Sequence, residues 1–201
     1  MGFWSKLFRR EEARGVTLSD PGWVLDAWGP KAASGISVTP DSAMRAIAVF
    51  ACVRLLAETV STLPLHLMRR TGSGGKEQAK DHPLYSILHD GPNPLMTATQ
   101  AGDAMMASLL LRGNAYALVV RGYAGEILEH IPLHPDRVRV ESSKSGRELV
   151  YIVDGKDRIL SGSMWHIRGF SIDGVMGVSP ITYAREAVGL ALAAERHGAA
   201  V

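Results

Sequence analysis

The first long run of periodic apolar residues predicts a helix over residues 39–62. Thr39 and Pro40 have the composition of an N-cap and a first helical position. Apolar residues then recur at the spacing of one helix face: Val49, Val53, Leu56 and Val60. The pattern predicts a mostly buried helix, and Cys52 within it is predicted to be a buried, unreactive thiol.

Residues 63–76 predict a strand followed by a tight turn. Leu63, Leu65 and Leu67 alternate with other residues, as is typical of a strand, and Pro64 suits a strand start or a sheet edge. The run TGSGGK lacks the pattern of a phosphate-binding loop, because Lys76 is followed by Glu rather than Ser or Thr. The run is therefore predicted to be a hairpin tip.

A second helix is predicted after the helix-breaking run DGPNP at residues 90–94. Thr97 and Gln100 have the spacing of a capping box, and methionines and leucines follow on one face. Gly102 disfavours a helix by roughly 1 kcal/mol relative to Ala, so we expect the helix to be loosened locally. Gly113 is predicted to end this helix in the left-handed conformation.

Alternating residues in the second half predict antiparallel strands. AYALVV turns at GYAG and returns as EILEHIPL, and a meander continues through DRVRVESS, RELVYIV, RILS and MWHIRG. The Asp154-Gly155 pair is a strong hairpin signal. Ser179 and Pro180 are predicted to begin one final helix, ITYAREAVGLALAAER. The predicted fold class is α+β, with helices packed on a mainly antiparallel sheet.

Composition narrows the classes of function. The chain has 201 residues, 46% of them hydrophobic, and a formal net charge of +2, so it can bury a core and has no strong general attraction for nucleic acid. One cysteine forms no internal disulfide, which favours a reducing compartment. The longest uncharged apolar stretch, residues 46–53, is far shorter than the roughly 20 residues that cross a bilayer. Residues 1–35, with several glycines and prolines, are predicted to be an N-terminal arm.

Candidate chemistry is weak throughout the sequence. His130 and His134 lie along a strand pattern, where four residues span roughly 13 Å, too far for two ligands of one zinc ion. The runs GFSID and GVSPI lack the closing glycine of a nucleophile elbow. The sequence therefore predicts no catalytic residue, no metal and no cofactor.

Several segments carry a family resemblance when they are taken in order. They are LLLRGNAYALVV, IPLHPDRVRV, MWHIRG and DGVMGVSPITYAREAVGLALAAERHGAA, preceded by AVFACVRLLAETVSTLPLHLMRR and HPLYSILHDGPNPLMTATQ. In this order and spacing the chain closely resembles the portal proteins, or head-to-tail connectors, of tailed bacteriophages and prophages. The resemblance covers roughly residues 36–201.

The resemblance implies a structural protein rather than an enzyme. Portal subunits form a homo-oligomeric ring, usually a dodecamer, at one capsid vertex, where the ring forms the channel for DNA packaging and ejection. The implied partners are other copies of the chain, the terminase large subunit, the major capsid or scaffold protein, head-completion or adaptor proteins, and double-stranded DNA, with no membrane. The implied location is the virion, after assembly in the cytoplasm of the bacterial host.

The resemblance also implies a division of the chain. Residues 36–178 are expected to form a wing-like domain, and residues 179–201 a helix approaching the stem of the ring. Because the chain stops soon after this helix, we expect the reading frame to continue. The residues of the shared motifs are expected to have structural roles: Gly113, Asn114, Tyr116, Pro132, Pro135, His166, Gly177 and Pro180.

Two other interpretations stay open. Four basic residues surround one predicted hairpin and could face DNA or a protein interface, as in a non-catalytic nucleic-acid-binding module: Arg137, Arg139, Lys144 and Arg147. A less favoured alternative is a hydrolase that uses Asp136 in HPD or Asp173 in HIRGFSID.

Overall fold

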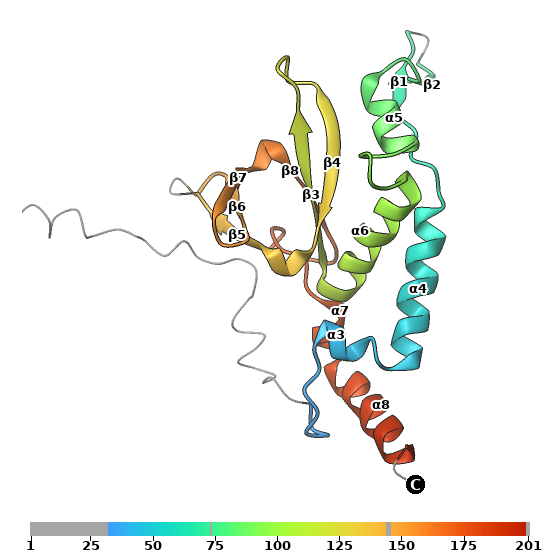
Figure 1. Ribbon diagram of the computed structural model, residues 1–201, viewed down its shortest axis with the longest axis vertical. Helices are drawn as coiled ribbons and strands as arrows, with labels where there is room; N and C mark the ends of the chain where they lie inside the picture. Colours follow the sequence, from blue (N-terminus) through green and yellow to red (C-terminus); the bar gives the residue numbers. More distant parts are fainter. Residues whose placement is uncertain (1–31, 73, 144–145, 200–201) are drawn as a thin grey trace, which may run out of the picture.

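The computed structural model describes residues 32–72, 74–143 and 146–199, and Figure 1 shows the arrangement of the helices and strands. The helices are α3 (Pro40–Ala43), α4 (Ile47–Ser61), α5 (Pro83–His89), α6 (Ala98–Arg112), α7 (Pro180–Tyr183) and α8 (Arg185–Gly198), with short 3-10 turns η1 (Pro135–Arg137) and η2 (Ser161–Ser163). The strands are β1 (Met68–Arg70), β2 (Lys76–Gln78), β3 (Asn114–Arg121), β4 (Ile127–Leu133), β5 (Val138–Ser142), β6 (Leu149–Val153), β7 (Asp157–Leu160) and β8 (Met164–Arg168). This mixture of helices and antiparallel sheets confirms the predicted α+β class.

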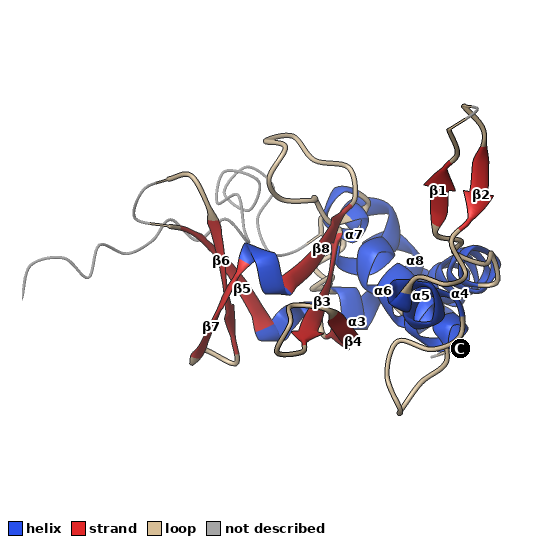
Figure 2. Ribbon diagram, turned by 90° about the horizontal axis from the view of Figure 1, so that it is seen from above, coloured by secondary structure: helices blue, strands red, loops and turns tan. Residues whose placement is uncertain are grey.

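The strands form three antiparallel sheets, with the orders β1-β2, β4-β3-β8 and β5-β6-β7. The sheet around β3 lies in the middle of the molecule, between the helices on one side and the β5-β6-β7 sheet on the other (Figures 1 and 2). The predicted meander is correct from β3 to β4 and from β5 to β7. It is wrong between β4 and β5, which lie in different sheets, and at β8, which pairs with β3 instead. Alternation identifies a strand and its two faces, but it does not specify which strand is its neighbour.

The predicted helix over residues 39–62 is wrong at its start. The chain forms α3, a break and then α4. A capping box between Thr39 and Ser42 begins the short α3. The prediction is also wrong about burial, because only Val53 and Ala57 of α4 are buried and Cys52 is exposed. The physical reason is that α6 packs against one face of α4, while the opposite face lies at the edge of the molecule (Figure 1).

The second predicted helix is α6, and its capping box between Thr97 and Gln100 is confirmed. The loosening expected at Gly102 is wrong, because α6 is continuous from Ala98 to Arg112. A Cβ atom at Gly102 would lie 2.9 Å from the Cβ of Ser61, so the glycine allows α4 and α6 to approach closely. The hydroxyl of Ser61 also donates a hydrogen bond to the carboxylate of Asp103.

Two other predicted elements are partly correct. The hairpin tip is confirmed, because Arg70 of β1 pairs with Lys76 of β2, but residues 63–67 form no strand. The final helix begins at Pro180 behind Ser179 as predicted, yet it breaks at Ala184 into α7 and α8. No cap residue in the sequence marks this break, since neither glycine nor proline occurs there.

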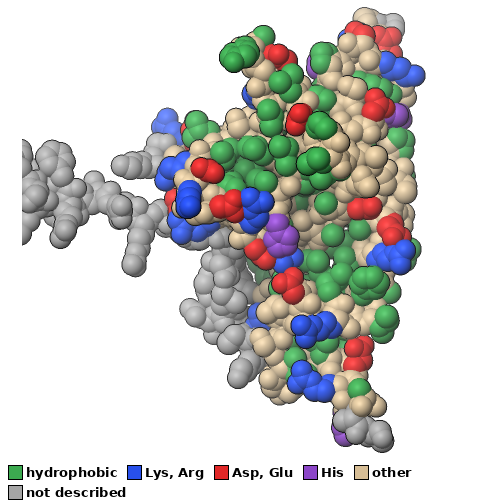
Figure 3. Space-filling view, viewed as in Figure 1, with side chains coloured by type: hydrophobic (Ala, Val, Ile, Leu, Met, Phe, Trp, Pro, Cys, Tyr) green, Lys and Arg blue, Asp and Glu red, His purple; other side chains and the backbone are tan. Residues whose placement is uncertain are grey.

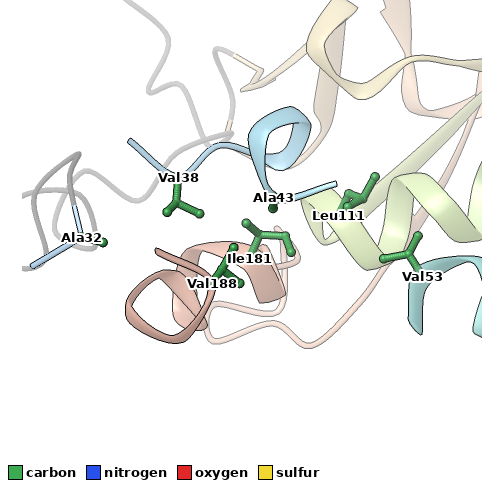
Figure 4. Close-up of a cluster of buried hydrophobic side chains, with 7 residues drawn as sticks. All are labelled: Ala32, Val38, Ala43, Val53, Leu111, Ile181 and Val188. Atoms are coloured by element: carbon green, nitrogen blue, oxygen red, sulfur yellow. The ribbon is translucent and has the colours of Figure 1, made fainter. Parts of the chain in front are cut away.

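Three groups of buried side chains hold the elements together. The first lies where α3, α4, α6, α7 and α8 meet (Figure 4), and contains Ala32, Val38, Ala43, Val53, Leu111, Ile181 and Val188. The second joins the β3 sheet to the β5-β6-β7 sheet, and contains Tyr116, Val138, Val140, Tyr151, Val153, Met164 and Met176. The third, Met105, Ala115 and Ala117, lies between α6 and the other face of β3. The middle sheet is thus packed on both faces.

Most of the predicted N-terminal arm, residues 1–31, lies outside the described residues. Its last residues belong to the fold, because Ala32 is 4% exposed and the amide of Ala33 donates to Glu186 of α8 at 2.9 Å. Among the described helices, none combines the length and the apolar character that crossing a membrane requires.

Candidate functional site around Asn114

The corner between α6 and β3 brings together several of the motif residues. Gly113 ends α6 with φ 75°, which confirms the predicted left-handed cap, and its amide donates to the carbonyl of Leu109 at 2.8 Å. A side chain at Gly113 would overlap the carbonyl of Val178, and one at Gly177 would overlap the carbonyl of Gly113. Two glycines are therefore required for the backbone around residue 177 to lie directly against this corner.

Asn114 holds that backbone in place with its side chain. Its Nδ2 donates to the carbonyl of Gly177 at 2.7 Å, and the amide of Gly177 donates to its Oδ1 at 2.8 Å. Asn114 is 6% exposed, so these bonds replace those that water would otherwise make. The amide group is needed because only a side chain that carries both a donor and an acceptor matches both backbone groups.

His166 of β8 orients the Asn114 amide from the other side. The Nε2 atom of His166 lies 3.0 Å from Asn114 Oδ1, and its Nδ1 atom lies 3.3 Å from the hydroxyl of Tyr151. Since Oδ1 only accepts, Nε2 carries the proton, and the tyrosine hydroxyl donates to Nδ1. Burial lowers the pKa of His166 to about 4, with a smaller contribution from the charge of Arg168, so the imidazole is neutral at pH 7.

Tyr116 completes this group on β3. Its ring centroid lies 4.6 Å from that of His166 and 6.0 Å from that of Tyr151, and the residue is 2% exposed. Burial raises the pKa of its phenol, so the hydroxyl stays protonated. A chain of side chains thus joins the β5-β6-β7 sheet, the middle sheet and the loop before α7.

A cavity of about 740 Å³ opens beside this junction, lined in part by Asn114, Tyr116 and Gly177. At its rim, Arg112 of α6 makes two bonds to Asp136, from Nε at 2.7 Å and from Nη2 at 2.8 Å. The same guanidinium reaches Asp41 of α3 at 3.1 Å, and its side chain is only 11% exposed. The hydrogen bond from Arg112 holds the pKa of Asp136 below its usual range. These pairs tie α3 and η1 to the end of α6.

The structure places the remaining motif residues outside the hydrogen-bonded group. Pro132 lies on β4 opposite Ala117, Pro135 begins η1 and lines the cavity, and Pro180 is the first residue of α7. No local pattern in the sequence indicated Tyr151, Arg112 and Asp41 as partners, because their contacts join segments far apart in the chain. The adjacency of Arg112 to the Gly113-Asn114 motif was the one available signal.

Two of the four residues in the predicted basic patch have acidic neighbours. Arg137 lies 2.6 Å from Asp154, and Arg139 lies 2.5 Å from Glu141. Arg147 lies beside the turn after β5, and Lys144 lies outside the described residues. Figure 3 shows red side chains beside the blue ones in this part of the molecule. Such a surface offers few free cations to phosphates.

The carboxylates considered for hydrolysis have structural partners. Asp136 is paired with Arg112, and Asp173 accepts hydrogen bonds from the amides of Val175 at 2.7 Å and Met176 at 2.8 Å. These bonds keep the pKa of each carboxyl below its usual range, which is the wrong direction for a general acid. Within the described part of the chain, no three His, Cys, Asp or Glu residues are grouped as metal ligands would be.

The fold and the junction define a structural α+β domain whose buried polar groups fix the relation between its layers. Comparison with known proteins gives the family. The model of the family described as phage portal protein matches residues 47–201. The chain is 36% identical to the probable portal protein of Streptomyces phage phiC31, over 98% of this chain and 47% of that protein. It is 30% identical to the portal protein of Enterobacteria phage HK97, over 83% of this chain and 41% of that protein.

A solved structure has a similar fold. The neck of an empty GTA particle computed with C6 symmetry contains a chain that matches with a TM-score of 0.66 and 25% identity, over 86% of this chain and 47% of that one. This chain belongs to the phage portal protein family. It spans about half the length of the two phage portal proteins.

Proposed function

We propose that this chain is part of a structural subunit of a phage portal ring at one vertex of the capsid. In this proposal the assembled ring forms the channel for packaging and ejecting double-stranded DNA. It also provides the platform on which the terminase large subunit and later the head-completion or adaptor proteins dock. The ring is assembled in the host cytoplasm with the major capsid or scaffold protein, and then remains in the virion.

The observation that carries the proposal is the family match over residues 47–201, together with the likeness to a chain from a symmetric particle neck. The charge balance supports it physically. Each phosphate neutralised by Lys or Arg strengthens DNA binding, so a channel subunit through which DNA slides should have few free cations. The formal net charge of +2 and the ion pairs of Arg137 and Arg139 agree with this requirement.

Within this proposal, residues 36–178 are the wing-like domain and α8 leads from it toward the stem of the ring. The junction around Asn114 then has a mechanical role, because it fixes the loop that precedes α7 and α8 against the middle sheet. The nucleic-acid-binding module is less favoured, because two of its four basic residues already have acidic partners.

The test is negative-stain electron microscopy of the protein expressed from the whole reading frame. We expect rings with a central hole, and dispersed monomers would contradict the proposal. A second experiment addresses docking: purified rings are mixed with the terminase large subunit and sedimented. Terminase should sediment with rings and should remain in the supernatant when unassembled subunits replace them. Equal behaviour of terminase in both samples would argue against the docking role.

A further inference from the structure

The outer face of α4 is an exposed apolar surface. It consists of exposed residues on the side of the helix opposite the buried Val53 and Ala57, with the Arg54–Glu58 ion pair beside Ile47 and Ala51: Ile47, Ala48, Ala51, Cys52, Leu55 and Thr59. Ile47 is 72% exposed and Leu55 is 67% exposed. α4 forms one edge of the molecule, and hydrophobic side chains are visible along this edge in Figure 3.

The outer face has the shape of a helix-docking surface. Ile47 and Leu55 are two turns apart, roughly 12 Å, and the small residues Ala48, Ala51 and Cys52 lie between them. Large side chains separated by small ones form a groove into which the ridge of another helix fits. Directly after α4, Leu63 is 64% exposed and Leu65 is 56% exposed, so the apolar surface extends beyond the helix.

The chemistry of the face excludes a phosphate-binding role. The one basic residue of α4, Arg54, is held by Glu58 at 2.7 Å within the face. The exposed apolar area is on the order of several hundred Å², which is the size that marks a protein interface rather than ordinary surface. Interfaces that stay assembled are the most apolar class, whereas partners that dock and leave use more polar surfaces.

We propose that the outer face of α4 is one half of the contact between neighbouring copies of this chain. The inference rests on the proposed ring, in which the permanently assembled partner is the next copy. A ring closes by head-to-tail contacts, so each copy buries two different patches, and the α4 face is one of them. A face that is largely apolar suits a contact with a neighbouring subunit that does not dissociate during DNA packaging.

Cys52 offers a direct probe, because it is the one cysteine in this 201-residue sequence and it lies on the proposed contact. Protein from the whole reading frame is separated by size exclusion into rings and unassembled subunits. Both fractions are treated with N-ethylmaleimide, and labelling of the peptide 46–54 is followed by mass spectrometry. We expect Cys52 to react at least about tenfold more slowly in rings, since burial requires a local opening before reaction.

A pair of variants tests the same contact by assembly. Leu55→Glu places a charge on the face at an exposed position, so the subunit should fold with unchanged circular dichroism but fail to form rings. Leu95→Glu is the matched control, because Leu95 is 89% exposed and lies outside α4. This variant should form rings like those of the unmodified protein. The labelling measurement does not depend on either variant.

The outcomes separate this inference from the proposed function. Rings in which Cys52 reacts as fast as in free subunits, or normal rings from Leu55→Glu, would overturn the α4 contact while the portal assignment stands. Equal protection of Cys52 in subunits and rings would mean that the chain itself covers the face, which also overturns the contact. Absence of rings from the unmodified protein would instead refute the proposed function.

Discussion

Acidification should destabilise the domain through His166. In the folded protein its pKa is lowered from 6.5 to about 4, because the imidazole is buried and, to a smaller extent, because the positive charge of Arg168 is nearby. The unfolded chain therefore binds the proton first as the pH falls, and the unfolded state gains stability. The contribution of neutral His166 is fully present above pH 6.5 and is lost progressively between pH 6.5 and pH 4.

The magnitude follows from the pKa difference. At about 1.36 kcal/mol per unit, the lowering from 6.5 to about 4 corresponds to a loss of up to about 3 kcal/mol of unfolding free energy. Burial also lowers the pKa of His130, so protonation of His130 likewise reduces the unfolding free energy as the pH falls. The lowered carboxylate pKa values, such as that of Asp136, act below 3.8 and leave this window largely clear.

The assay is urea unfolding of the 201-residue chain at a series of pH values between 7 and 4, followed by circular dichroism. His166→Gln should be less stable at pH 7 but should show a pH dependence that is flatter by up to about 3 kcal/mol over this window. Tyr151→Phe removes the donor to Nδ1, so it should raise the pKa of His166 and reduce the loss on acidification. An identical pH dependence in His166→Gln and the unmodified protein would refute the reasoning.

Three further predictions concern stability and use urea unfolding at pH 7. Gly102→Ala should destabilise the protein by about 1–2 kcal/mol although Ala is the better helix former, because the new Cβ would lie 2.9 Å from that of Ser61; increased stability would contradict the close approach of α4 and α6. Gly113→Val should cost more than about 1 kcal/mol, since it combines a left-handed φ of 75° with overlap at the Val178 carbonyl, and an unchanged free energy of unfolding would exclude this explanation. Asn114→Asp keeps the shape but loses the donor to the Gly177 carbonyl, so it should cost about 1–3 kcal/mol and increase hydrogen exchange in residues 169–178; unchanged exchange would show that the side chain does not hold the loop.

Local signals in the sequence determined most of the elements. The capping box of Thr97 and Gln100, the left-handed Gly113 and the start of α7 at Pro180 each depend on a few adjacent residues, so they were predicted correctly. The family resemblance also came from the sequence, because its motifs combine such local signals in a fixed order. The motif residues around Gly113 could be named from the sequence, but the hydrogen bonds that join Asn114 to Gly177 and His166 could not.

Only the tertiary structure decided which elements meet. The pairing of β8 with β3, the burial of Asn114 against Gly177 and the use of Gly102 as a helix contact all join segments far apart in the chain. The exposed face of α4 is the clearest case, because an apolar helix has the same sequence whether its own domain or another molecule covers it. Periodicity specifies that a face avoids water, whereas the surface that covers it depends on the packing of the whole fold and its partners.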